Sequence, residues 1–355
     1  MVHNRISIAN LSRVFGGAER HCIGLAENLA ACGFKIQLIV RENGWAKTVL
    51  GEGERQKFEI VDVKYPLGII SARRAVSKFG PDLIHCHLGK TAKWIRWVCG
   101  ATPVVATLHG HYKSKYYKPC SGLICVAPWQ LEKLDWKKPA IVIPNFISEL
   151  NPHDLGVARV EFRKSMGVMD HEILIGSYGR FTKEKDFGTL LRAFSKITLP
   201  NFKLVIAGEG PERAVLESVK PPRAVLIDWV DNPQQILPAF DLFVSPSKEE
   251  SFGLAILEAM NCGIPVVATS THGARFQAEG GGIELVPCED PESMARSIVR
   301  LGNDTAVRSA MALRAKVNVR RFSNVVAIEK IINFYKEIIE KRFPVGAGAN
   351  SKIVG

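Results

Sequence analysis

The sequence has 355 residues and a hydrophobic content of 46%, which is typical of a globular α/β protein and long for a single core. No apolar stretch matches a signal peptide or the roughly 18 residues of a membrane span. The eight cysteines form no Cys-x-x-Cys pair. Together these features predict a cytosolic chain with reduced thiols. The net charge of +12 is uneven, since residues 1–150 carry 21 Lys and Arg against 11 Asp and Glu, whereas residues 151–300 carry 16 against 20. Without a recognisable nucleic-acid module, this distribution favours an anionic membrane surface or a phosphorylated acceptor as partner.

The chain opens with an alternation of strand, glycine loop, helix and strand. Residues 5–10 predict a strand, residues 18–32 a helix and residues 34–40 a second strand. This is the start of a doubly wound fold, but the Gly-x-Gly-x-x-Gly fingerprint is absent, so a dinucleotide site is not expected. Gly16 and Gly17 precede the helix and fit a tight turn that needs glycine dihedrals, which is compatible with a further role in binding a ligand.

Histidines mark the ends of the next two predicted strands. His85 and His87 occupy alternate positions in the strand over residues 81–87, so they share one face. They could bind a metal, but no third ligand accompanies them, and a buried or ligand-lining role is favoured. The strand over residues 103–109 ends at His109, at the edge where open parallel sheets bind ligands.

Two segments of the first half combine basic and aromatic residues. Residues 90–100 mix Lys with Trp, which suits a membrane interface or an ordinary helix that packs its Trp side chains on the sheet. Residues 112–118, YKSKYYK, predict a loop that holds an acceptor, contacts lipid head groups or is simply solvated.

The most informative stretch spans residues 239–273. It predicts a buried strand over 241–245, a polar loop, a helix over 252–261 and a second buried strand over 265–269. Glu250 precedes the helix, and Glu258 lies about one and a half turns inside it. A helix N-terminus suits a phosphate or another polar ligand, and carboxylates accept hydrogen bonds from paired hydroxyls such as those of a ribose or a hexose.

This stretch resembles the Glu-x7-Glu motif of the retaining GT-B glycosyltransferases of family 4 type (glycosyl transferases group 1). The matching residues are Pro246, Ser247, Glu250, Phe252, Gly253, Glu258, Ala259, Met260, Gly263, Pro265, Val266, Val267 and Ala268. The resemblance implies an α/β protein with two Rossmann-like domains facing a central cleft. An acceptor domain would span residues 1–150, a nucleotide-sugar domain 151–322, a helix crossing back to the first domain 323–343 and a flexible tail 344–355.

The resemblance also implies roles for individual residues. Arg180 and Lys185, in a polar loop after the strand over residues 172–177, match the pair that clamps the donor diphosphate in the family. Glu250 and His109 would position the donor sugar, and Glu258 would hold the ribose hydroxyls. The rest of the donor pocket would come from Gly16, Gly17, Gly210, Phe252, Gly253 and Leu254.

The function implied is the retaining transfer of a sugar from a nucleotide-sugar donor, with neither a metal nor another cofactor. By family prevalence the donor is a UDP-sugar, with GDP as the rival. The acceptor would be a growing cell-surface glycan such as lipopolysaccharide core, capsule or a lipid-linked saccharide, met by a cytoplasmic protein at the inner face of the membrane. Alternatives are a nucleotide-sugar epimerase, a soluble saccharide synthase and a non-catalytic nucleotide-sugar-binding scaffold; free epimerised sugar in a donor-only reaction would identify the epimerase.

Overall fold

The computed structural model describes residues 4–342 of the chain, which is divided by its internal contacts into two compact units. Unit 1 comprises Met1–Cys125, Gln130–Ile143 and Val325–Gly355, and unit 2 comprises Val126–Trp129 and Pro144–Asn324. The structural division therefore falls after residue 143, where the sequence predicts a boundary at 150. The predicted tail, 344–355, lies outside the described residues.

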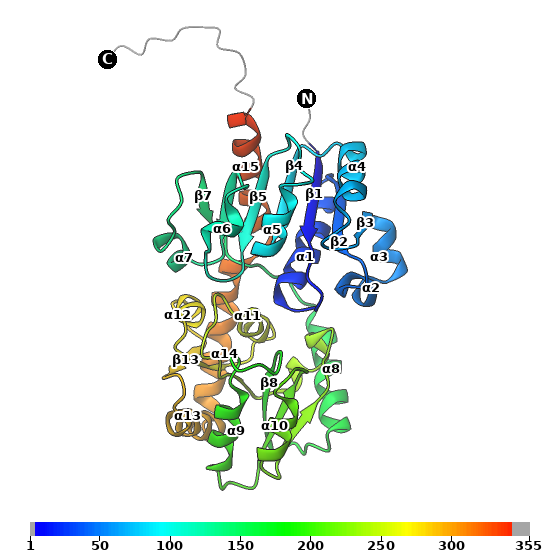
Figure 1. Cartoon of the computed structure of the whole chain (residues 1–355). Coiled ribbons are helices and arrows are strands. Elements are labelled where there is room, and N and C mark those ends of the chain that lie inside the picture. Colours follow the sequence, from blue (N-terminus) through cyan, green and yellow to red (C-terminus); the bar gives the residue numbers. More distant parts are fainter. Residues whose placement is uncertain (1–3, 343–355) are drawn as a thin grey trace, which may run out of the picture. The chain divides into compact units, whose positions relative to one another are not determined.

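Unit 1 is built on a parallel sheet in which the described strands follow the order β3-β2-β1-β4-β5-β6-β7 (Figure 1). The strands are β1 Arg5–Asn10, β2 Lys35–Arg41, β3 Glu59–Val63, β4 Leu83–His87, β5 Val104–Leu108, β6 Gly122–Cys125 and β7 Ala140–Val142. Strands β4 and β5 are buried at every residue, as expected of parallel strands covered on both faces. The strand order reverses beside β1, and open parallel sheets bind ligands at the carboxyl edge of such a point.

Helices from both ends of the chain cover this sheet. They are α1 Gly17–Ala31, α2 Trp45–Val49, α3 Glu52–Lys57, α4 Ile69–Phe79, α5 Gly89–Ile95, α6 Ser114–Tyr117 and α15 Asn324–Arg342. The short helix α7 Pro128–Glu132 contains the division between the units. Side chains of α4 and α5 share one apolar cluster with β4 and β5. On β6, a Cβ added to Gly122 would lie 2.9 Å from the ring of Phe334 and 2.8 Å from Ile338 Cδ1. The last helix of the chain therefore packs directly on a strand of the first sheet.

Unit 2 repeats the parallel arrangement with the described strands in the order β10-β9-β8-β11-β12-β13. The strands are β8 Ile173–Tyr178, β9 Phe202–Ala207, β10 Ala224–Ile227, β11 Leu242–Ser245, β12 Val266–Thr269 and β13 Ile283–Val286. The order reverses between β8 and β11. Loops that leave the carboxyl ends of these two strands are therefore neighbours although they are far apart in the sequence.

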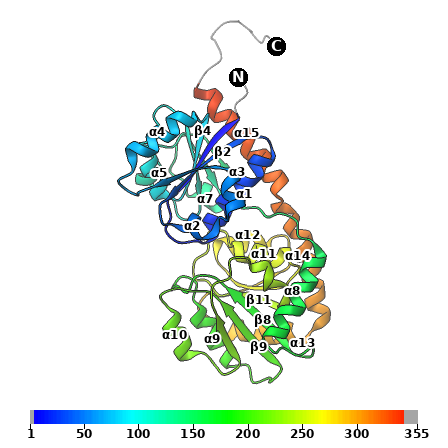
Figure 2. The same ribbon diagram turned by 90° about the vertical axis from the view of Figure 1, so that its right-hand side faces the viewer.

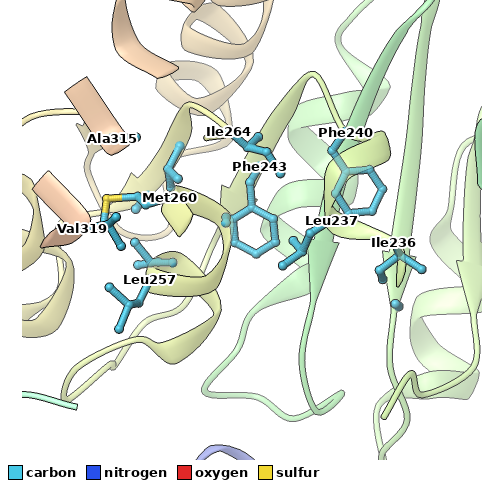
Figure 3. Packing of buried hydrophobic residues seen from close by; sticks show 14 of the residues in the cluster. Ile236, Leu237, Phe240, Phe243, Leu257, Met260, Ile264, Ala315 and Val319 are labelled. Atoms are coloured by element: carbon cyan, nitrogen blue, oxygen red, sulfur yellow. The ribbon is translucent and has the colours of Figure 1, made fainter. Parts of the chain in front are cut away.

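Helices lie on both sides of the strands of unit 2 (Figure 2). They are α8 Pro152–Ser165, α9 Phe187–Ser195, α10 Arg213–Val219, α11 Leu254–Asn261, α12 His272–Ala278, α13 Pro291–Asn303 and α14 Thr305–Asn318. One apolar cluster joins α9 and α13 to the sheet, and a second joins α11 and α14 to it. In the second cluster, Leu257 and Met260 of α11 lie beside Phe243 of β11 (Figure 3). Gly176 of β8 leaves the room that Phe240 fills there, since a Cβ at Gly176 would lie 1.9 Å from the ring.

The structure corrects some predicted boundaries and adds short helices. The helix predicted over residues 90–100 ends at Ile95 and continues as turns. Helices α10 and α12 are short segments that hydrophobic periodicity does not reveal. Among the described helices, none has both the length and the apolar character that crossing a bilayer requires.

Candidate functional site

The loops after β8 and β11 meet where the strand order of unit 2 reverses. The ammonium group of Lys185, in the first loop, forms an ion pair with the carboxylate of Glu250, in the second. The loops are also joined through their backbones, because the N–H of Lys248 donates to the carbonyl of Glu184 over 2.8 Å. The side chains of Lys185 and Glu250 remain 30% and 19% exposed, so a ligand can reach both. The structure thus brings these two predicted site residues into contact.

Arg180 begins the same loop as Lys185, and its side chain is exposed. Both cations act on Glu184, whose pKa is lowered first by hydrogen bonds from its own backbone amide and from Thr182, and then by Arg180 and Lys185. This loop therefore presents two positive charges at the carboxyl edge of the sheet.

Gly210 supports this loop through close backbone packing. A Cβ at Gly210 would lie 2.4 Å from the carbonyl oxygen of Phe181, and one at Gly208 would lie 2.0 Å from the carbonyl oxygen of Gly179. The N–H of Phe181 donates to the carbonyl of Glu209 over 2.7 Å, which locks the two loops together. Glycine is needed here because the backbones touch. A contact of Gly210 with a ligand stays a prediction.

The segment from Glu250 to Gly253 is held in place by α12. The N–H of Gly273 donates to the carbonyl of Glu250 over 2.9 Å, and the side-chain amide of Gln277 donates to the carbonyls of Phe252 and Gly253 over 2.5 and 3.0 Å. The side chain of Phe252 is only 2% exposed and belongs to the core. Of the groups of Phe252, the backbone amide is therefore the one that can serve a ligand.

Helix α11 starts from Gly253, whose φ of 97° lies in the left-handed region that favours glycine. Leu254, in the first turn, packs against the core of unit 2. Glu258 is half-buried one turn further on. Burial, followed by the Glu258 carboxylate, raises the pKa of the Cys262 thiol to about 12. A helix N-terminus, two cations and two carboxylates at one sheet edge suit a ligand with both phosphate and hydroxyl groups.

In unit 1, Gly16 and Gly17 form the entry to α1. Gly16 is the N-cap in an extended conformation, with a φ of −169°, and its carbonyl accepts the N–H of Arg20 over 3.0 Å. Neither glycine adopts a positive φ. The tight-turn explanation is therefore wrong, because this geometry does not require glycine. An approach of bare backbone to a ligand stays a prediction.

His109 belongs to a cluster of four histidines at the carboxyl ends of β4 and β5. Its Nε2 lies 2.9 Å from Nδ1 of His87, which stacks on His85 with ring centroids 4.7 Å apart, and the His21 ring packs edge-on against His87 and His109. Nδ1 of His85 lies 2.5 Å from the hydroxyl of Tyr335 on α15. Burial lowers the pKa of all four rings, to about 4 for His21 and about 3 for His85. The cluster is neutral at pH 7.

A pocket of about 750 Å³ opens beside His109 within unit 1. It is formed by the carboxyl ends of β1, β2, β4 and β5 and the segments that follow them. Its lining consists of Leu11, Ser12, Arg13, Arg41, Tyr65, Leu88, Gly89, Lys90, Thr91, His109, Gly110, His111, Lys113, Tyr116 and Tyr117. Gly16 and Gly17 do not line it.

Comparison with known families accounts for both units. The family described as Glycosyltransferase Family 4 matches residues 15–149, and the family described as Glycosyl transferases group 1 matches residues 172–304. The chain is a family 4 glycosyltransferase.

Relatives of this glycosyltransferase extend over nearly its full length. It is 27% identical to the lipopolysaccharide core biosynthesis glycosyltransferase LpsE of Rhizobium meliloti, over 92% of this chain and 96% of LpsE. It is 26% identical to the UDP-Gal:alpha-D-GlcNAc-diphosphoundecaprenol alpha-1,3-galactosyltransferase of Escherichia coli, over 95% of this chain and 98% of that enzyme. These relatives connect the chain with enzymes of surface-glycan synthesis.

Solved structures assign the glycosyltransferase to the GT-B fold. HepE of Anabaena, in complex with UDP-glucose, superimposes with a TM-score of 0.81 at 21% identity, covering 94% of this chain and all of HepE. WaaG, a glycosyltransferase involved in lipopolysaccharide biosynthesis, gives a TM-score of 0.71 at 16% identity, covering 93% of this chain and 99% of WaaG. The predicted fold class, two parallel-sheet α/β domains of GT-B type, is confirmed.

Sequence reasoning missed several groups that shape these two sites of the glycosyltransferase. His21 and Tyr335 complete the histidine cluster from α1 and α15. In unit 2, Asp186 caps α9 through its carboxylate and lies 4.0 Å from the ammonium group of Lys248. His21 and Tyr335 meet their partners only through the tertiary fold, so hydrophobic periodicity offers no signal for them. Asp186 alone has a local sign, because it directly precedes a helix.

Proposed function

We propose that this glycosyltransferase transfers a sugar from a UDP-sugar to a growing cell-surface glycan with retention of anomeric configuration. The observation that carries the proposal is the ion pair of Lys185 with Glu250 at the reversal point of the unit 2 sheet, beside exposed Arg180. Breaking a sugar–phosphate bond leaves negative charge on the nucleotide diphosphate. Cations fixed at that position stabilise the charge as it develops.

We assign separate tasks to the residues of this edge. Arg180 and Lys185 hold the diphosphate, the Glu258 carboxylate accepts the ribose hydroxyls, and Glu250 orients the sugar. The departing phosphate takes the proton of the acceptor hydroxyl on the face that it leaves. The new bond then forms on that same face, and the configuration is retained. His109 enters the reaction as a neutral imidazole, because burial holds its pKa well below the usual range.

Nucleotide binding tests the donor assignment. Structural neighbours of the chain were solved with UDP or UDP-glucose, which supports UDP over GDP. We expect UDP to raise the melting temperature of the wild-type chain, whereas GDP, ADP and TDP do not. At a hundredfold excess over Kd the stabilisation amounts to about 2.7 kcal/mol. Glu258→Ala should lose the shift, and Glu161→Ala, which alters an exposed glutamate on α8, should keep it.

A shift with GDP alone would replace UDP in this proposal, and no shift with any nucleotide would contradict the donor site. The same donor then tests the stereochemistry. A product made from an α-linked UDP-sugar should show the α configuration in its anomeric proton coupling. An inverted product would overturn the front-face displacement.

The acceptor is proposed from the relatives and from the charge of the chain. Enzymes of lipopolysaccharide core synthesis and of diphosphoundecaprenol-linked saccharides match it over nearly all of its length. The basic first half suits an acceptor held at an anionic membrane surface. We therefore place the protein in the cytoplasm, in peripheral contact with the inner face of the membrane.

One edge of unit 1 carries the features of such a contact. Leu67 and Ile70 are 80% and 70% exposed, and Trp97 is 52% exposed. The indole N–H of Trp94, on α5, donates to the carbonyl of Pro66 over 3.1 Å. This hydrogen bond holds the segment that contains Leu67 next to α5, and Trp97 lies in the turn that follows α5. Exposed basic residues flank the first segment, namely Lys64, Arg73 and Arg74. Exposed apolar side chains among cations match an anionic bilayer surface.

Replacing two of these apolar side chains should weaken membrane binding. We expect Leu67→Ser with Ile70→Ser to reduce the affinity for phosphatidylglycerol vesicles by about tenfold or more, because each side chain loses its transfer into the interface. The matched control is Val160→Ser with Leu313→Ser, two residues of unit 2 that are each 67% exposed. Co-sedimentation measures both variants. A wild-type chain that ignores these vesicles would contradict the membrane proposal.

A further inference from the structure

The unit 1 pocket has an unusual charge balance. Its described lining contains Arg13, Arg41, Lys90 and Lys113, and it contains neither Asp nor Glu. In the part of the chain that the structure describes, these four cations have no ion pair with a carboxylate. His109 adds no charge, since its ring is neutral at pH 7. The pocket is therefore a concentrated positive site whose charge no carboxylate of its lining offsets.

The cations converge because of the sheet topology. Arg13 follows β1, and Arg41 ends β2. Lys90 lies in the first turn of α5, after β4, and Lys113 lies in the segment after β5. The order β2-β1-β4-β5 puts these four strand ends side by side. Four separate segments thus direct basic residues to one cavity, at the place where a parallel sheet receives its ligand.

The pocket is also shaped by fixed aromatic and backbone groups. The guanidinium of Arg41 lies 5.3 Å from the centroid of the Tyr65 ring, which holds it at the wall. Gly89 admits Tyr116, because a Cβ at residue 89 would lie 2.9 Å from that ring. Leu88 adopts a φ of 71°, a left-handed conformation that a leucine takes only when its surroundings impose it. The site is preorganised and includes hydroxyl donors that suit phosphate oxygens.

We propose that this pocket binds the phosphate group of a phosphorylated acceptor and so selects acceptors that carry a phosphoryl group beside the hydroxyl to be glycosylated. The proposal rests on the proposed function, because it names the acceptor class for that same transfer. Arg and Lys recognise phosphate through charge-assisted hydrogen bonds, and a pocket without carboxylates does not repel the ligand. The phosphoryl group belongs either to a soluble phosphosugar or to a lipid carrier.

Direct binding of phosphate tests the pocket independently of the donor. The host is the full chain with Arg180→Ala and Lys185→Ala, so that phosphate does not occupy the proposed donor site. Inorganic phosphate is titrated calorimetrically into this host, and vesicles of phosphatidylcholine with phosphatidic acid are used in a parallel arm. The pocket variant adds Arg13→Gln and Lys90→Gln. The control instead adds Lys93→Gln and Lys118→Gln, which remove two exposed charges outside the lining.

We expect the pocket variant to bind about tenfold more weakly, and the control to match the host. A loss for inorganic phosphate indicates a soluble phosphosugar, and a loss on vesicles alone indicates a lipid phosphate. Either outcome supports the pocket. Equal binding by host, pocket variant and control in both arms would overturn it. A failure of UDP to stabilise the wild-type chain would instead count against the donor site in unit 2 and leave this result unaffected.

Discussion

Replacing Lys185 by Ala should lower kcat by about 10²–10³-fold, a loss of roughly 2.7–4 kcal/mol of transition-state stabilisation. Lys185 neutralises Glu250 in the resting enzyme, and in our proposal it meets the diphosphate as charge develops on it. The interaction grows stronger along the reaction, so the loss should fall on kcat more than on KM. Initial rates with saturating UDP-sugar measure it.

The neighbouring lysine provides the control for this experiment. Lys183 lies in the same loop with an exposed side chain, and Lys183→Ala should keep its rate within about twofold, because an isolated surface charge contributes little. Lys185→Arg should recover part of the activity, since a guanidinium still pairs with Glu250. Full activity in Lys185→Ala, or an equal loss in Lys183→Ala, would refute the assigned role.

Acid should destabilise unit 1 already below about pH 6.5, above the range in which most carboxylates titrate. The four clustered histidines have folded pKa values below the 6.5 of an unfolded chain, to about 4 for His21 and about 3 for His85. The unfolded chain therefore binds more protons, and the stabilising effect of the neutral rings is complete above pH 6.5. Below that pH the contribution of each ring to the free energy of unfolding falls by about 1.4 kcal/mol per pH unit, until the folded pKa of that ring is reached.

The losses of the four rings are large beside the roughly 5–15 kcal/mol that stabilises a typical domain. Urea titrations at pH 7, 6 and 5 measure the decline. His87→Asn should make it shallower by about one proton, whereas His153→Asn, an exposed histidine of unit 2, should leave the slope unchanged. Stability that stays constant from pH 7 to pH 5 in wild type would show that the rings are protonated in the folded state.

Sequence alone identifies much of the donor-side edge because its signals are local. The stretch over residues 239–273 predicts β11, α11 and β12 and places Glu250 and Glu258 around a helix start, as found. The predicted position of Lys185, in the loop after β8, is also correct. Its contact with Glu250 spans 65 residues and depends on β8 pairing with β11, and strand order is not encoded in any short window.

The groups missed by sequence reasoning share a physical reason. Periodicity predicts the buried face of a helix from its apolar residues, so it overlooks a polar residue such as His21. His21 is nevertheless buried, and it packs against other histidine rings. Tyr335 meets His85 across 250 residues. The basic pocket depends on four strand ends coming together, and no short window of the sequence contains both Arg13 and Lys90.

The packing of α15 on β6 has a consequence for the order in which the protein matures during synthesis. The strands of unit 1 leave the ribosome first, whereas Phe334, Tyr335 and Ile338, which cover Gly122 and pair with His85, are made after the whole of unit 2. Nascent chains generally complete their N-terminal domain first. Here the first sheet keeps an uncovered apolar strand until α15 has been synthesised, so unit 2 has all of its described segments before unit 1 does.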